Sequence, residues 1–137
     1  MKIYIGADHA GYRLKKELKK HFNLIDLGNS QLDQNDDYPD FARKVSQKVK
    51  KDKNSKGILI CGGGQGMSMV ANRQKGIRAS LGYSIQAAKI SRKDNDSNIL
   101  CLASRELKKK EALKIVNTFL KTPFSKIKKH QRRINKI

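Results

Sequence analysis

Cys61 and the glycines after it are the residues whose types and spacing point most clearly to chemistry. The apolar run Ile58–Ile60 leads into Cys61, and glycine occupies four of the next five positions. A short strand, a glycine turn and a helix over residues 67–72 would aim backbone N–H groups at an anion. A thiol at the mouth of such a turn is favoured as a reactive thiolate. A tight turn beside a small buried core cysteine is the alternative explanation.

The glycine loop does not match the common nucleotide-binding motifs. A dinucleotide fingerprint G-x-G-x-x-G that starts at Gly62 requires glycine where the sequence has Met67. No acidic residue follows near the end of the next expected strand, and no Walker lysine is present. The loop therefore favours a small phosphorylated or enolate-forming ligand over a nucleotide.

Polar side chains that could serve such a ligand occur at three other places. Asp8 and His9 directly follow the first expected strand, either as a titratable pair or as a cap of the next helix. Residues 94–96 (Asp-Asn-Asp) precede the fifth expected strand, where a simple turn is the alternative. Residues 121–137 contain seven Lys or Arg residues and no acidic one. This basic tail is either solvated charge or an anion-binding segment.

Apolar spacing predicts five short strands that alternate with helices. The strands are expected over residues 2–6, 24–27, 58–60, 77–81 and 98–103. Helices are expected over residues 10–22, 39–51 and 67–72. Two more are expected to begin after Ser84 and Ser104, which would act as their N-caps, and Pro123 would end the second of these. The order predicts an α/β fold, a three-layer Rossmann-like doubly wound sheet of five parallel strands with helices on both faces. Ligands of such sheets bind beyond the carboxyl ends of the strands.

Composition limits the class of protein. The 137 residues fit a single domain, 1–137, and no run approaches the roughly 18 apolar residues that span a membrane. The first strand begins at once and leaves no room for a signal peptide, so a cytoplasmic location and no membrane partner are expected. The net charge of +19 comes from 23 Lys and eight Arg spread along nearly every expected helix. This distribution favours a solvated lysine surface and no specific nucleic-acid partner.

Neither a disulfide nor a metal site is expected. Cys61 and Cys101 each close a strand-like run in a chain with cytosolic character, and Cys101 is expected in the core. The histidines His9, His21 and His130 lie far apart in the sequence, with no pair at metal-ligand spacing.

Seven segments, taken in order, resemble the ribose-5-phosphate isomerase B family, which includes the galactose-6-phosphate isomerase subunits. The segments are Gly6–Gly11, Asp37–Pro39, Ile58–Ser68, Ala71–Arg73, Gly76–Ala79, Ser91–Leu100 and His130–Arg133. Their order and spacing extend over nearly the whole chain.

The resemblance implies an aldose–ketose isomerase of the non-oxidative pentose phosphate pathway, with no metal and no organic cofactor. Such an enzyme interconverts ribose 5-phosphate and ribulose 5-phosphate through a cis-enediolate. By this similarity Cys61 is the base that moves a proton between C1 and C2. The similarity also assigns stabilisation of the enediolate to the backbone N–H groups of Gly62, Gly63, Gly64, Gln65 and Gly66.

The resemblance also implies how the phosphorylated pentose is held. Asp8 and His9 would contact the sugar and phosphate, and Asn95 would hold the intermediate. Arg133, with Lys129 nearby, would bind the phosphate. Members of the family are dimers or dimers of dimers with sites built across the interface. A homodimer or homotetramer is therefore expected, with the tail 121–137 reaching a neighbouring subunit.

Three positions depart from the family pattern. Asp94 occupies the place of the usual ring-opening histidine, and the resemblance implies that it is the second catalytic residue beside Cys61. An ordinary aspartate, with a pKa of about 3.9, is a weak base and a poor acid at pH 7. Lys129 stands where arginine is common and Gly63 where threonine or serine is frequent. The alternatives are an isomerase of allose 6-phosphate or galactose 6-phosphate, a noncatalytic sugar-phosphate-binding protein, and a basic nucleic-acid binder.

Overall fold

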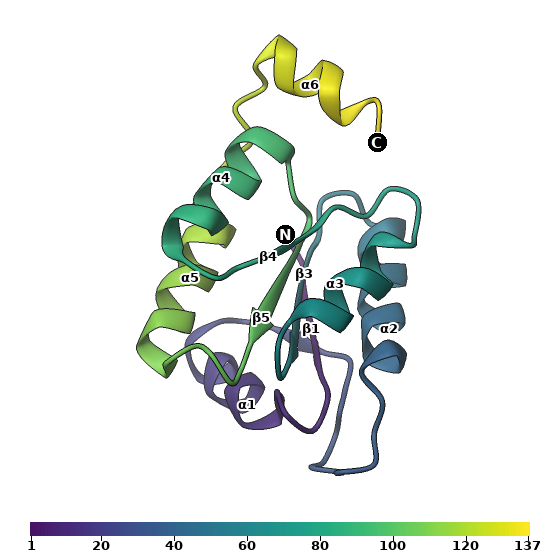
Figure 1. Cartoon of the computed structure of the whole chain (residues 1–137), viewed down its shortest axis with the longest axis vertical. Coiled ribbons are helices and arrows are strands. Elements are labelled where there is room, and N and C mark those ends of the chain that lie inside the picture. Colours follow the sequence, from purple (N-terminus) through teal and green to yellow (C-terminus); the bar gives the residue numbers. More distant parts are fainter.

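The computed structural model describes residues 1–137 and contains one sheet of five parallel strands surrounded by six helices (Figure 1). The strands are β1 (Ile3–Ala7), β2 (Ile25–Asp26), β3 (Lys56–Cys61), β4 (Ala79–Leu81) and β5 (Ile99–Ala103). The helices are α1 (Tyr12–His21), α2 (Tyr38–Lys51), α3 (Gln65–Asn72), α4 (Ile85–Asn95), α5 (Lys109–Lys121) and α6 (Lys128–Ile134). The spatial order of the strands is β2-β1-β3-β5-β4. The doubly wound parallel sheet predicted from the sequence is confirmed.

Each face of the sheet is covered by helices that turn an apolar side towards it. On one face, Val45 of α2 and Met67 of α3 belong to a buried cluster with Leu59 of β3. On the other face, Phe119 of α5 belongs to a second buried cluster with Ile58 of β3. Successive residues of β3 point to opposite faces, so this strand is buried on both sides. Its unbroken apolar sequence follows from that position.

The chain changes direction across the sheet between β1 and β3. It leaves β1 towards β2 on one side and leaves β3 towards β4 on the other. In open α/β sheets such a switch point opens a crevice beyond the carboxyl ends of the strands. Asp8 directly follows β1, and Cys61 is the last residue of β3. The fold therefore places these two residues at the ligand-binding edge.

Most helices begin and end close to the positions that the sequence predicts. Ser84 caps α4, since its Oγ accepts a hydrogen bond from the backbone N–H of Ala87 at 3.0 Å. The tail forms the short helix α6. None of the six helices combines the length and the apolar character needed to cross a lipid bilayer.

The prediction that Ser104 caps the next helix is wrong, because α5 begins later, at Lys109 after Lys108. The reason is that the chain continues to pair with the end of β3 before it turns. The backbone N–H of Ser104 donates to the carbonyl of Cys61 at 2.9 Å, and that of Arg105 donates to Gly62 at 3.1 Å. The expected fourth strand is also shorter, since β4 begins at Ala79.

Replacing Gly11 by alanine should destabilise the fold, because the chain enters α1 here against the end of β3. A Cβ atom at this position would lie 2.5 Å from the carbonyl oxygen of Ile60. The backbone of a central strand cannot withdraw, so we expect Gly11→Ala to lower the free energy of unfolding by about 1–3 kcal/mol. Urea denaturation measures this change. Gly63→Ala is the control, since the nearest atom to its Cβ would be Gln65 Cγ at 3.8 Å. Equal stability of the two variants would contradict the prediction.

Candidate active site at the switch point

The thiol of Cys61 lies at the start of α3. The residue is 6% exposed, and its Sγ accepts a hydrogen bond from the backbone N–H of Gly64 at 3.2 Å. Gly64 is the N-cap of α3 with a φ of 71°, a left-handed conformation that favours glycine. The N–H donor and the positive end of the helix both favour a negative charge on the sulfur. The loop therefore places the Cys61 thiol beside a backbone N–H donor at the N-terminus of a helix.

Two side chains that sequence reasoning missed pack against this loop. A Cβ atom at Gly62 would lie 2.7 Å from the guanidinium carbon of Arg105. A Cβ atom at Gly66 would lie 2.5 Å from the ring of Tyr38. These glycines leave room for a guanidinium and a phenol beside Cys61. Arg105 is the second residue after β5, and closeness to a strand end is the signal that singled out Asp8.

Asp36 holds His9 in place through two contacts. One carboxylate oxygen, Oδ1, accepts the backbone N–H of His9 at 2.8 Å and also lies 2.8 Å from its Nδ1. This side-chain hydrogen bond raises the pKa of the His9 imidazole. Neighbouring Asp8 is 6% exposed, and burial raises the pKa of its carboxyl group. Neither residue type nor spacing singled out Asp36, which lies in the irregular segment between β2 and α2.

A buried lysine supports the loop that carries Asp36. Lys15 of α1 is 1% exposed, and its Nζ donates to Asp26 Oδ1 at 2.9 Å and to the backbone carbonyl of Asn29. Burial lowers the pKa of this ammonium group. The side-chain amide of Asn29 in turn donates to Asp36 Oδ2 at 3.0 Å. Lys15 therefore acts on His9 through a chain of three contacts.

An open pocket of about 450 Å³ lies beside His9. Arg13 and Arg105 line the same pocket, together with the polar residues Gln34 and Ser104. Two guanidinium groups and an imidazole with a raised pKa favour an anionic group such as a phosphate. The pocket is thus a binding place for the charged end of a small ligand.

Asp8, His9 and Asp36 also lie close enough together to be considered as ligands of a metal ion. One possible ligand atom from each lies within 4.8 Å of the others. Each group, however, already has a hydrogen-bond partner within the protein: Asp8 accepts the backbone N–H of Gly11 at 3.1 Å, and Asp36 is paired with His9. The neighbouring cationic pocket opposes a divalent cation. We therefore interpret the three residues as a hydrogen-bonded support for the ligand.

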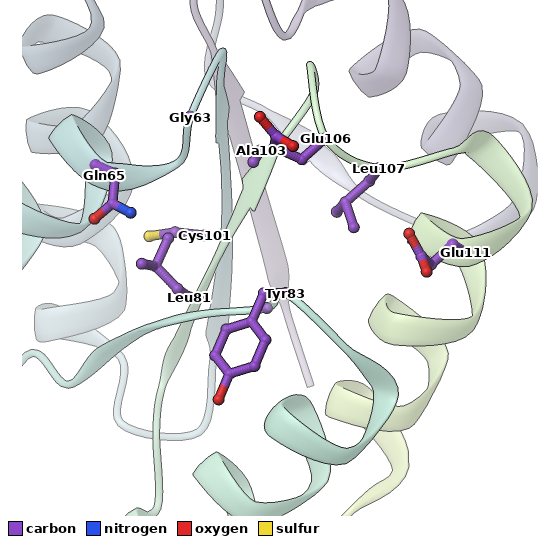
Figure 2. Close-up of a pocket in the computed structure, with 10 residues that line it drawn as sticks. Gly63, Gln65, Leu81, Tyr83, Cys101, Ala103, Glu106, Leu107 and Glu111 are labelled. Carbon is purple, nitrogen blue, oxygen red and sulfur yellow. The ribbon is translucent and has the colours of Figure 1, made fainter.

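A second cavity, of about 490 Å³, borders the other side of the glycine loop (Figure 2). Cys101 lines it and Cys61 does not, and the carboxylates of Glu106 and Glu111 stand at one side. These carboxylates would repel a phosphate. Cys101 is fully buried, and burial raises the pKa of its thiol, so this residue is not the reactive thiolate. Its interpretation as a core residue is confirmed.

The remaining predicted site residues lie at the opposite edge of the sheet. Asp94 and Asn95 end α4, which runs back from the carboxyl end of β4 to the amino end of β5 (Figure 1). Lys129 and Arg133 are exposed on α6, which packs beside α4. One chain therefore brings together Asp8, His9, Cys61 and residues 62–66, but not these four. The predicted site residues therefore form two separate groups. The first half-site contains Asp8, His9, Cys61 and residues 62–66, and the second half-site contains Asp94, Asn95, Lys129 and Arg133.

The chain matches known proteins over nearly its whole length. Residues 3–137 match the model of a family described as Ribose/Galactose Isomerase. The chain is 39% identical to ribose-5-phosphate isomerase B of Mycobacterium tuberculosis, over 98% of this chain and 86% of the relative. It is similar to the crystal structure of ribose-5-phosphate isomerase B from Mycoplasma genitalium with bound ribulose-5-phosphate, with a TM-score of 0.93, 47% identity and coverage of 98% and 92%. It is also similar to a ribose-5-phosphate isomerase B structure from Clostridium thermocellum, with a TM-score of 0.93 and 42% identity. That match covers 99% of this chain and 94% of the other.

Removing the carboxylate of Asp36 should lower the pKa of His9. In Asp36→Asn the imidazolium loses its main stabilising partner, so its NMR titration midpoint should fall towards the ordinary value of about 6.5. The pair stabilises the fold below pH 6.5, and this contribution disappears as the pH rises through the raised pKa of the folded state. Asp33→Asn, an exposed carboxylate in the same loop, is the control. An unchanged midpoint in Asp36→Asn would contradict the prediction.

Proposed function

The chain belongs to the Ribose/Galactose Isomerase family, and from this membership we propose that it interconverts ribose 5-phosphate and ribulose 5-phosphate. One observation carries the proposal. A relative of 47% identity and the same fold is a ribose-5-phosphate isomerase B that holds ribulose-5-phosphate. The proposed reaction belongs to the non-oxidative pentose phosphate pathway. It moves hydrogen within one molecule and so needs no external oxidant or reductant.

Cys61 is the proposed base of this reaction. Its thiolate takes the proton from C2 of the open-chain aldose, and the electron pair forms the C1–C2 double bond of a cis-enediolate. As this double bond forms, the electron pair of the C1 carbonyl moves to O1. The O2 hydroxyl then passes its proton to O1, and its O–H electron pair forms the C2 carbonyl. The pair of the C1–C2 double bond takes the proton back from Cys61 at C1, which gives the ketose. The position of Sγ, close to the start of α3 and within 3.2 Å of the Gly64 nitrogen, supports this role.

The glycine loop is the proposed holder of the enediolate. Gly62 and Gly64 are buried, whereas Gly63 and Gln65 are exposed. Backbone N–H groups of residues 62–66 that face the two developing oxygen charges lower the barrier without reorganisation. The phenol of Tyr38 packs on Gly66 and can donate to the same oxygens.

The proposed phosphate site joins groups from two chains. His9, Arg13 and Arg105 provide the pocket on the chain that carries the thiol. Lys129 and Arg133 lie too far away in their own chain, at the opposite edge of the sheet, and would come from a second copy. Asp8 would hold a sugar hydroxyl.

Asn95 of the second copy would contact the intermediate. Such sharing requires a homodimer or a homotetramer. The tail 121–137 of each single-domain chain would then extend into its neighbour. A two-fold arrangement makes the exchange reciprocal, because each chain gives its tail and receives one.

A different sugar phosphate is the second candidate. The family description includes galactose isomerases, and the pocket beside His9 is open on one side. Allose 6-phosphate and galactose 6-phosphate are therefore the substrates to compare with ribose 5-phosphate. A noncatalytic sugar-phosphate-binding protein would bind these compounds without turnover.

Replacing Cys61 by alanine should abolish isomerisation. We expect kcat for ribose 5-phosphate to fall by at least about 1000-fold, because no other group in the loop can take the C2 proton. A coupled assay for ribulose 5-phosphate measures the rate. Cys101→Ala is the matched control, since it removes the buried thiol of β5 and leaves the loop intact. Full activity of Cys61→Ala would overturn the proposed role of the thiolate.

Two inactive variants should restore each other's activity if the site is shared between chains. Cys61→Ala damages one half-site, and Arg133→Ala damages the other. A mixed dimer carries one site with both changes and one site with neither. After subunit exchange at equal concentrations, about a quarter of the wild-type activity should return. No recovery, in a sample whose mixed dimers are demonstrated by native mass spectrometry, would show that each chain completes its own site.

A further inference from the structure

His130 is the half-buried imidazole on an otherwise exposed basic helix. Its side chain is 15% exposed, and its Nε2 lies 3.7 Å from Asp94 Oδ1 at the end of α4. The segment before α6 is fixed to α4, because the backbone N–H of Ser125 donates to the carbonyl of Lys93 at 3.0 Å. An imidazole and a carboxylate are thus held together on the half-site that carries Arg133.

Opening the sugar ring requires a proton donor besides the groups that bind the anion. Aldose phosphates with a free C4 hydroxyl exist mainly as rings, and proton abstraction at C2 needs the open aldehyde. An aspartate at pH 7 is deprotonated and cannot donate, whereas imidazole with its ordinary pKa of about 6.5 can do so. Asp8 already accepts the Gly11 N–H, and His9 is held by Asp36 beside the anion pocket.

We propose that His130, positioned by Asp94, is the acid that opens the sugar ring in the active site of a second copy of this chain. The inference rests on the isomerase function proposed above. The C1–O4 bond breaks, and its electron pair stays on O4, which takes a proton from His130. The C1 hydroxyl loses its proton to water as its O–H electron pair becomes the second bond of the C1 carbonyl.

Asp94 acts through His130 and is a positioning residue. Nε2 of the imidazole faces the carboxylate, which leaves Nδ1 free to face the substrate. The carboxylate lies beside the imidazole and orients the ring, as carboxylates commonly do for catalytic histidines. In this chain Asp94 occupies the position of the usual ring-opening histidine, and the imidazole comes instead from α6. Asp94 and His130 together would thus perform the ring opening that the resemblance assigns to a single histidine in other family members.

The test separates ring opening from proton transfer. Ribulose 5-phosphate is open-chain, because the oxygen that would close its five-membered ring carries the phosphate. Exchange of its C1 proton with D2O, followed by NMR, therefore needs Cys61 and an assembled site but no ring opening. Conversion of ribose 5-phosphate to ribulose 5-phosphate needs both steps.

In His130→Asn, conversion of ribose 5-phosphate should fall by about 100-fold, while the C1 exchange of ribulose 5-phosphate stays within about threefold of wild type. Asp94→Asn should lower the conversion of ribose 5-phosphate by about tenfold and, like His130→Asn, leave the C1 exchange of ribulose 5-phosphate nearly unchanged. The double variant Asp94→His/His130→Asn should regain at least about tenfold over His130→Asn, because it returns an imidazole to the end of α4. Lys128→Ala, an exposed change on the same helix, is the control and should leave both rates unchanged.

Other outcomes overturn the inference. Equal losses of conversion and exchange in His130→Asn would assign the residue to binding or assembly, and no loss in either would remove it from the reaction. Wild-type protein that is inactive in both assays would overturn the proposed function as well. The two failures are therefore distinguishable, since the first occurs in an active enzyme and the second does not.

Discussion

The pairing of β3 between β1 and β5 determines where every residue of the first half-site lies. Ala7 is in register with Ile60, and Cys61 with Ala103. The pairing continues past the strand ends, because the N–H of Asp8 donates to the carbonyl of Ile60 at 3.2 Å and that of Arg105 to Gly62. Neighbouring strands are about 4.8 Å apart, so a carboxylate, a thiol and a guanidinium meet across three adjacent strands. No long loop has to be ordered for this.

The same parallel order separates the second half-site from the first. Each helix must return the chain from the carboxyl edge to the amino edge before the next parallel strand can begin. Residues at the end of α4 therefore lie a full strand length from the thiol, whatever their chemistry. The association of α6 with α4 collects Asp94, His130 and the basic side chains at that edge. Contact between copies is the simplest way to unite the edges.

Chain order alone predicted much of the fold and the grouping of Asp8 and Cys61 at one edge of the sheet. Cys61 and Asp8 follow apolar runs directly, and parallel topology then fixes them at one edge. Asp36 could not be found this way, since its contact with His9 joins residues 27 positions apart through an irregular loop. Ser104 is a residue for which the prediction was wrong. Its type suits a helix cap, but tertiary pairing with the end of β3 delays the helix by several residues.

The division of the residues between opposite edges also separates folding from catalytic competence. The two buried clusters that stabilise the sheet lie within one chain. In the shared site proposed above, the thiol and the tail meet only between chains. Association of the chains would then follow mass action, as ligand binding does, so the protein concentration would set the fraction of complete sites. Dilution below the dissociation constant would silence the enzyme before its helices melt. The rate per chain would thus depend on the concentration of the protein itself and rise to a plateau as the copies pair.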